Sequence, residues 1–128
     1  MTDAIGTFRI NIELENRSGV GPRRGVGGVL VDTGSELSWI LAPVLESLGI
    51  ERLKVKRFRQ ATGAIVERWT GEARILAAGT FTTDEVVFGE PADLVILGSR
   101  TLEGLNVMVD PVGRRLVDSG PAPVAVAA

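Results

Sequence analysis

The chain has 128 residues, a formal net charge of −2, and neither cysteine nor histidine. This length fits one domain and leaves no room for two full ones. The absence of cysteine excludes disulfides, thiolate nucleophiles and zinc–thiolate sites, and the absence of histidine excludes a Ser-His-Asp triad. The acidic residues Asp84, Glu85 and Asp93 do not have the spacing of metal ligands and no histidine supports them, so we expect no metal, and we expect no other cofactor. The scattered Lys and Arg residues give no reason to expect nucleic acid as a partner.

Hydrophobic residues make up 45% of the chain, enough for a packed core, and 16 Gly with 6 Pro favour many turns between short strands. We expect an all-β domain with one or two short helices. No apolar run approaches the ~20 residues of a membrane span. Residues 1–6 lack the basic start and apolar core of a signal peptide. The sequence thus predicts a soluble, cytoplasmic protein with no membrane partner.

The first elements predicted in chain order are two strands and a helix. Apolar and polar residues alternate over 8–14, which predicts a strand with one buried face. A second strand is expected over 26–31, where a Gly-Gly pair indicates a bulge. A short helix follows, because Pro43 suits its first position and Gly49 suits the position after its end.

The middle of the chain predicts a hairpin and two further strands. Residues 53–58 and 64–69 have strand character, and a small turn separates them. Alternation marks another strand at 73–77, and the apolar residues 86–88 end the next one.

The C-terminal part predicts a buried strand, a helix and a second hairpin. The strand is the apolar run 94–97, and Ser99 is expected to cap the helix that follows. The hairpin spans 105–117. Residues 1–120 are thus expected to form the single domain, and the Pro-containing residues 121–128 to form a flexible tail.

The tetrapeptide Asp32-Thr33-Gly34-Ser35 follows the second predicted strand directly. A carboxylate at the end of a buried strand is a costly placement, because burial disfavours its charged form unless it finds partners. A capping turn is one explanation, since Asp, Thr and Ser all bond to local backbone. The other explanation is that Asp32 is a catalytic group.

Three features together resemble the retropepsin-like aspartic proteases, the single-lobe, retroviral type that includes small stand-alone bacterial members. Residues 30–35, Leu-Val-Asp-Thr-Gly-Ser, are similar to the active-site loop of that family. Residues 94–98, Leu-Val-Ile-Leu-Gly, look like the apolar-apolar-Gly segment that underlies the loop. The order of Asp loop, hairpin and apolar strand is also similar, and the match covers roughly residues 26–117.

The chain departs from the family pattern at two places. Many retroviral members have Ala at the position of Ser35. Those members also end in a strand that builds the dimer interface, whereas this chain ends in a segment with two Pro residues.

The resemblance implies a single-lobe acid-protease barrel that is closed as a homodimer. Aspartic proteases hold a water between two carboxylates that share one proton, and use one as general base and the other as general acid. This chain has one Asp-Thr-Gly. The second Asp32 would therefore come from a symmetry-related chain. The implied activity is that of an aspartic endopeptidase with a polypeptide substrate.

The resemblance also assigns roles within the loop. Asp32 is the implied catalytic residue, and Thr33, Gly34 and Ser35 support it. Gly34 would donate its N–H to the carboxylate. Thr33 would turn its hydroxyl to the partner chain, and Ser35 would orient the outer carboxylate oxygen.

The tip of the first predicted hairpin, Ala61, Thr62, Gly63 and Ala64, would close over the substrate as a flap and exclude water. An ordinary surface hairpin is the alternative interpretation.

Three other features have more ordinary interpretations. Asp118-Ser119-Gly120 mimics the catalytic loop, but only eight residues follow it, so we interpret it as a charged strand end. Trp39 and Trp69 are expected in the core, although they could line substrate pockets. The basic run 54–59 is interpreted as a solvated strand face, with attraction of acidic peptides as the alternative.

Two other functions stay open at this level. The same fold could hold extended peptides in a dimer cleft without turnover, as a non-catalytic binding or scaffold module. A processing enzyme that cleaves only one partner is the third candidate. The intact Asp32-Thr33-Gly34 favours the endopeptidase, because a module without catalysis has no chemical need of the acid.

Overall fold

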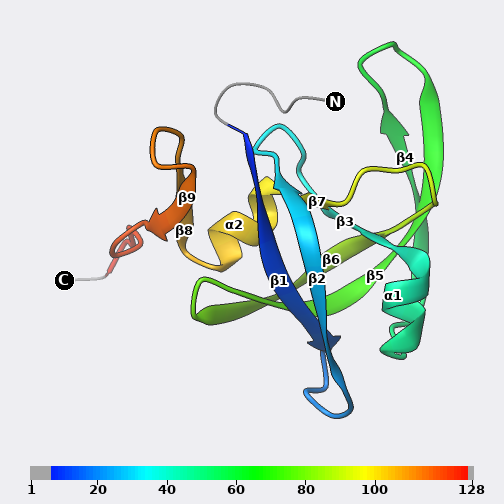
Figure 1. Cartoon of the computed structure of the whole chain (residues 1–128), viewed down its shortest axis with the longest axis horizontal. Coiled ribbons are helices and arrows are strands. Elements are labelled where there is room, and N and C mark those ends of the chain that lie inside the picture. The colour runs from blue at the N-terminus through cyan, green and yellow to red at the C-terminus, as the bar shows by residue number, and fades with distance from the viewer. Residues whose placement is uncertain (1–6, 127–128) are drawn as a thin grey trace.

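A computed structural model describes residues 7–126, which form mainly strands with two short helices, as the all-β prediction requires. Residues 1–6, on which the signal-peptide argument depends, and the last two residues of the predicted tail lie outside the described residues. The elements are β1 Phe8–Asn16, β2 Arg23–Val31, β3 Ser38–Leu41, α1 Ala42–Ser47, β4 Lys54–Arg59, β5 Ile65–Ala77, β6 Thr80–Gly89, β7 Ile96–Leu97, α2 Ser99–Gly104, β8 Val107–Asp110 and β9 Arg115–Asp118 (Figure 1).

Seven strands form one mixed sheet in the order β1-β2-β7-β3-β6-β5-β4, and β1 also pairs with β5. The sheet therefore curls back on itself. The two-residue strand β7 is parallel to β2 and antiparallel to β3. It thus fills the space between two strands that are consecutive in the chain, and the connection between them passes around its end. Strands β8 and β9 form a separate hairpin, which lies to one side of the sheet in Figure 1.

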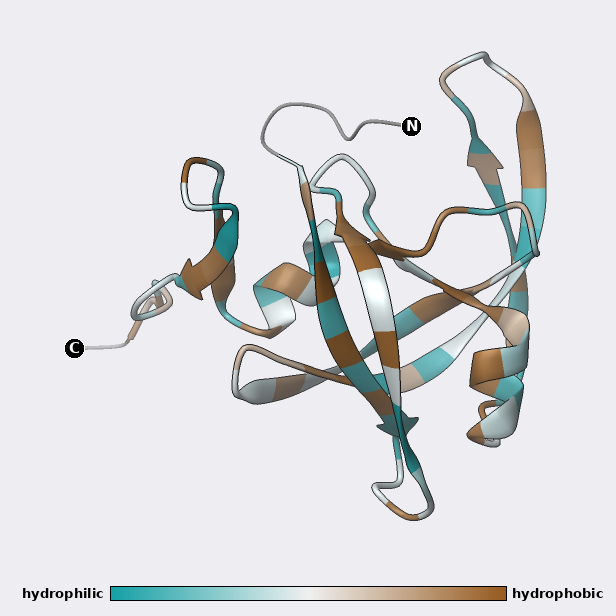
Figure 2. Ribbon diagram, in the orientation of Figure 1, coloured by the Kyte–Doolittle hydropathy of each residue, from teal (hydrophilic) through white to brown (hydrophobic). Residues whose placement is uncertain are grey.

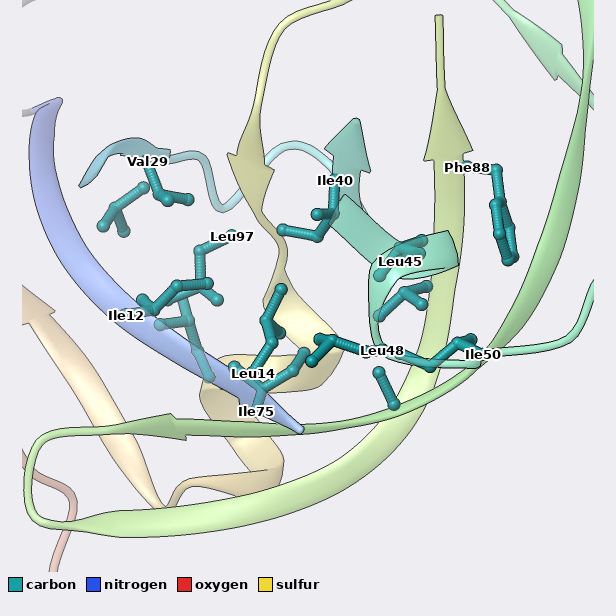
Figure 3. Packing of buried hydrophobic residues seen from close by; sticks show 14 of the residues in the cluster. Ile12, Leu14, Val29, Ile40, Leu45, Leu48, Ile50, Ile75, Phe88 and Leu97 are labelled. Atoms are coloured by element: carbon teal, nitrogen blue, oxygen red, sulfur yellow. The ribbon is translucent and has the colours of Figure 1, made fainter. Parts of the chain in front are cut away.

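The core follows from the alternation of side chains along the strands. In β1 the apolar positions Phe8, Ile12 and Leu14 are buried and the polar positions between them are exposed. Figure 2 shows the alternation of apolar and polar residues along this strand. Each fully buried Leu, Ile or Val contributes about 1.5–3 kcal/mol. These side chains meet others from β2, β3, β5, β6, β7 and both helices in one cluster (Figure 3).

Several predicted elements are confirmed. The Gly-Gly bulge lies in β2, where the register against β1 shifts between Ile10 and Ile12, and Gly28 has a φ of +67°. The structure also contains the helix after the Asp loop and both hairpins. Of the strand predicted at 94–97, only the last two residues are a strand, β7. Residues 121–126 have no regular structure and are exposed.

Three predictions about the fold were wrong, and one strand was missed. Strand β3 was not predicted. The two strands expected at 64–69 and 73–77 are one strand, β5, which continues through Gly71, where a side chain would collide with the backbone of Glu51. Helix α2 is capped by Gly98 without any side-chain bond, so Ser99 is not its cap. Trp69 is 45% exposed and does not belong to the core.

Neither helix in the described part of the chain is long and apolar enough to cross a membrane.

Candidate active site

Asp32 lies at the end of β2, half-buried, in a tight turn. Its backbone N–H donates to the carbonyl of Leu97 at 3.1 Å, so it continues the pairing of β2 with β7. The N–H of Gly34 donates to its Oδ1 at 2.9 Å, as predicted. The other carboxylate oxygen has no hydrogen bond and the side chain has no ion pair within residues 7–126. The Gly34 N–H thus orients Oδ1, and Oδ2 is available to bond to a water or another group.

The pairing register places Asp32 on a partly exposed face of the sheet. Leu30 pairs with Ile96, and Ile96 pairs with Trp39, so these three side chains share one face. Asp32 follows Leu30 by two positions and lies on the same face. The opposite face carries buried side chains, namely Val29, Val31, Ile40 and Leu97. The carboxylate is therefore at the end of a half-buried apolar row.

The start of α2 holds the Asp loop through its backbone. The N–H of Ser99 donates to the carbonyl of Ser35 at 2.7 Å, and the N–H of Arg100 donates to the carbonyl of Glu36 at 3.1 Å. Gly98 makes this approach possible, because a Cβ there would be 2.5 Å from the carbonyl oxygen of Leu37. The loop shape thus depends on a segment more than sixty residues away in the sequence.

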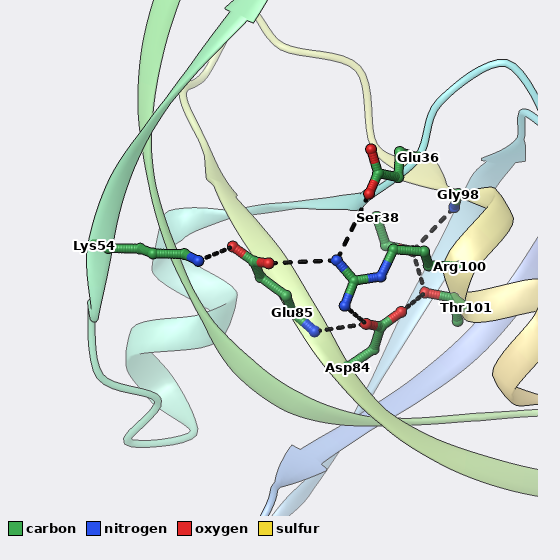
Figure 4. Close-up of polar contacts among 8 residues, drawn as sticks. All are labelled: Glu36, Ser38, Lys54, Asp84, Glu85, Gly98, Arg100 and Thr101. Carbon is green, nitrogen blue, oxygen red and sulfur yellow. Dashed lines mark hydrogen bonds and ion pairs between the residues drawn. The ribbon is translucent and has the colours of Figure 1, made fainter.

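A buried chain of hydroxyls continues from this contact (Figure 4). The hydroxyl of Ser38 accepts the N–H of Gly98 at 2.9 Å and lies 2.6 Å from the hydroxyl of Thr101. Thr101 donates in turn to Oδ2 of Asp84 at 3.1 Å. Ser38 and Thr101 have no exposed surface. This chain connects the strand after the Asp loop to β6.

Arg100 forms the solvent edge of the same network. Its guanidinium lies 3.4 Å from Asp84, 3.5 Å from Glu85 and 3.8 Å from Glu36. The side chain is 43% exposed, so each pair contributes less than about 1 kcal/mol. On the far side, Lys54 of β4 lies 3.7 Å from Glu85 (Figure 4). The network therefore joins the Asp loop, β6 and the base of the hairpin.

Replacing Thr101 with Val is expected to destabilise the protein by about 1–3 kcal/mol, because Ser38 and Asp84 each lose a buried partner. The measurement is the free energy of unfolding in urea. Thr83→Val is the matched control, since Thr83 is exposed on the neighbouring strand. Equal stability of the two variants would contradict the role of this network.

Two supporting residues differ in how well they fit their predicted roles. The hydroxyl of Ser35 donates to the carbonyl of Leu37 at 2.8 Å. The prediction that Ser35 orients the carboxylate of Asp32 was therefore wrong, because the turn brings a backbone carbonyl closer to this hydroxyl. Thr33 is exposed, and its hydroxyl has no partner within residues 7–126. Its predicted contact with a partner chain stays a prediction.

The predicted hairpin is formed by β4 and β5, and residues 61–64 are at its exposed tip. The N–H of Gln60 donates to the carbonyl of Ala64 at 2.8 Å, and Gly63 has a φ of +91°. In Figure 1 the tip extends beyond the rest of the molecule, at the same end as the β2–β3 connection. The rings of Phe58 and Trp39 are 4.9 Å apart. The Phe58 face of the hairpin is thus turned toward the face that carries Asp32.

A partly buried ion pair also holds the base of the hairpin. Arg68 of β5 donates to both carboxylate oxygens of Asp93, at 2.8 and 3.0 Å, and the two side chains are 13% and 17% exposed. Hydrogen bonding from Arg68 lowers the pKa of Asp93 below its ordinary value of 3.8, although burial opposes this shift. Asp93 lies in the loop that leads to β7, so the pair connects the hairpin to the strand beneath the Asp loop.

The lowered pKa gives a pH-dependent prediction. A depressed carboxylate pKa in the folded state contributes stability above the ordinary pKa of 3.8, and this contribution is lost as the pH falls through the folded-state pKa. Asp93→Asn should therefore cost about 2 kcal/mol near neutral pH, and the difference from the wild type should shrink at pH values below 3.8. Urea unfolding at several pH values measures this difference. Glu103→Gln, at an exposed residue without an ion pair in the described chain, should change little at any pH.

The turn at Asp118-Ser119-Gly120 has the same local hydrogen bond as the Asp32 loop but lacks the contacts of that loop with β7 and α2. The N–H of Gly120 donates to Oδ1 of Asp118 at 2.6 Å, just as Gly34 does to Asp32. Asp118 is exposed and ends β9 of the separate hairpin, which agrees with its interpretation as a charged strand end. A local hydrogen bond alone therefore does not distinguish the two loops, whereas the contacts with β7 and α2 do.

Two of the larger surface hollows lie away from Asp32. One, of about 400 Å³, is beside the network and is lined by residues that include Lys54, Glu85 and Arg100. The other, of about 540 Å³, lies along the β5–β6 turn. Within residues 7–126 no group of three or more acidic side chains is arranged to hold a metal ion.

Neither a protein-family model nor a curated protein matches the sequence.

Proposed function

We propose that this chain is a retropepsin-like aspartic endopeptidase that is active as a homodimer. The observation that carries the proposal is the setting of Asp32. One of its oxygens accepts the N–H of Gly34 and the other is free of partners in the described chain. The loop around it is held by β7 and by the start of α2. A capping turn needs the hydrogen bond from Gly34 to Asp32. It needs neither a free second oxygen nor the contacts of the loop with β7 and α2.

Each chain has only one Asp-Thr-Gly aspartate, which supports a site shared between two chains. The nearest other acid in the loop, Glu36, is within 3.8 Å of Arg100. A second Asp32, related by two-fold symmetry, would supply the missing acid. The exposed Thr33 of each loop is available to bond to the other loop.

The two carboxylates would hydrolyse a peptide bond with one bound water. Like charges this close do not both ionise, so one acid stays protonated and the pair titrates as a unit. The ionised Asp32 takes a proton from the water, whose oxygen attacks the carbonyl carbon. The protonated Asp32 donates its proton to the carbonyl oxygen. Breakage of the C–N bond then follows, with a proton passing to the leaving nitrogen.

The hairpin would form the other wall of the substrate cleft. An extended polypeptide would lie along the half-buried apolar row that ends at Asp32, and the contact between the rings of Phe58 and Trp39 would close one side of this cleft. Residues 61–64 would close over it and exclude water.

The test is cleavage of an unstructured polypeptide from about pH 3 to about pH 7, with and without an inhibitor whose hydroxyl mimics the tetrahedral intermediate. The proposal expects cleavage that the inhibitor suppresses. Binding of the polypeptide without cleavage at every pH would favour the non-catalytic module instead.

A further inference from the structure

The hairpin of β4 and β5 has a charge opposite to that of the rest of the protein. Residues 54–69 contain five cationic side chains and one carboxylate, a net charge of +4. The whole chain carries −2, so the remaining residues carry −6. Cations are therefore concentrated on the wall proposed to cover the substrate.

Two of the five cations are neutralised within the chain. Arg68 is bound to Asp93, and Lys54 lies 3.7 Å from Glu85. Arg57 lies 3.9 Å from Glu67, but these side chains are 72% and 64% exposed, so the pair contributes little.

The remaining two cations of the hairpin, Lys56 and Arg59, have no ion pair within residues 7–126. Lys56 does act on Glu85 at longer range. Burial alone would raise the pKa of Glu85, while the neighbouring Thr70 hydroxyl and the cations Lys54, Lys56 and Arg100 lower it overall. The charge of Lys56 thus acts on the network around Glu85 without forming an ion pair there.

Strand alternation assigns these cations to faces of the hairpin. Lys56 is two residues from Phe58 and shares its face. That face is turned toward Trp39 and the Asp32 side of the sheet. Arg57 and Arg59 are on the other face, exposed to solvent. A peptide beneath the hairpin would therefore meet an apolar surface at Phe58 and a cation about 6.6 Å away.

From this arrangement we propose that the substrates are acidic polypeptides, in which Asp or Glu side chains flank an apolar residue. This inference rests on the proposed function, since it uses the same cleft. Lys56 would pair with an acidic side chain inside the cleft, and Arg57 and Arg59 would attract acidic segments as they approach. Nucleic acid fits less well, because the negative charge of the remaining surface would repel a long polyanion.

The experiment uses three peptides with one apolar centre and flanks of Glu, Gln or Lys. Cleavage is measured near pH 6, where Glu is ionised. Binding to the Asp32→Asn protein is measured in parallel. We expect the Glu peptide to have a kcat/KM about tenfold above that of the Gln peptide, mainly through KM, and the ratio to fall with added salt.

Variants identify the residue responsible. Lys56→Gln should reduce the preference for the Glu peptide about threefold or more. Arg114→Gln removes one positive charge from the turn between β8 and β9 and should leave the preference unchanged. Circular dichroism checks that both variants are folded. An equal effect of the two variants would overturn the assignment, because net charge alone would then explain the preference.

The outcomes separate this inference from the proposed function. Equal cleavage of the Glu and Gln peptides overturns the acidic preference and leaves the endopeptidase intact. If no peptide is cleaved but the Asp32→Asn protein binds the Glu peptide best, the proposed function fails and the preference holds. Tighter binding of a single-stranded oligonucleotide than of the Glu peptide would overturn the inference.

Discussion

Replacing Asp32 with Asn is expected to lower kcat/KM by at least about a thousandfold while the protein stays folded and dimeric. Asn has nearly the same shape and can still accept the N–H of Gly34. It cannot take a proton from water or share one with its symmetry mate. Cleavage of a polypeptide, circular dichroism and size-exclusion chromatography together measure the effect.

Asp118→Asn is the matched control for this variant, because Asp118 is in the same kind of turn and accepts the N–H of Gly120. It should retain full activity. Full activity of the Asp32 variant, or equal losses in both, would contradict the proposed mechanism.

Replacing Gly98 with Ala is expected to have the largest effect on stability, a loss of about 2–3 kcal/mol. The added Cβ would lie 2.5 Å from the carbonyl oxygen of Leu37 and 2.8 Å from that of Glu36. Both are backbone atoms of the Asp loop, so the loop itself must move. We therefore expect activity to fall together with the free energy of unfolding.

Gly25→Ala is the control for this substitution, since an added Cβ there has no atom within 4 Å. It should change stability by only a few tenths of a kcal/mol. If Gly98→Ala were equally mild, the close approach of α2 to the Asp loop would not be what fixes the loop.

Strands in which apolar and polar residues alternate clearly were predictable from the sequence. Strands whose position depends on distant partners were not. Residues 8–14 show their buried face directly, and β1 is found there. Strand β3 has only four residues and runs directly into a helix. Its parallel partner begins its pairing at Val86, 48 residues after Ser38, so no local pattern marks it.

In the candidate site too, contacts between residues close in the sequence were predictable and contacts between distant residues were not. Asp32 and Gly34 were predicted from one tetrapeptide, because their hydrogen bond is local. The Ser38–Thr101 contact joins residues 63 positions apart and has no sequence signal. The role of Ser35 was misjudged because the choice between two nearby acceptors depends on the turn geometry.

The central claim is that two chains share one catalytic site. The most direct test measures the peptidase activity of a mixture of active and inactive chains. Wild-type protein and Asp32→Asn protein are combined in equal amounts at fixed total concentration and allowed to exchange subunits. If each site needs both carboxylates, random pairing leaves about one quarter of the activity of the wild type alone. A site complete within one chain would leave about one half, and that result would contradict the shared dyad.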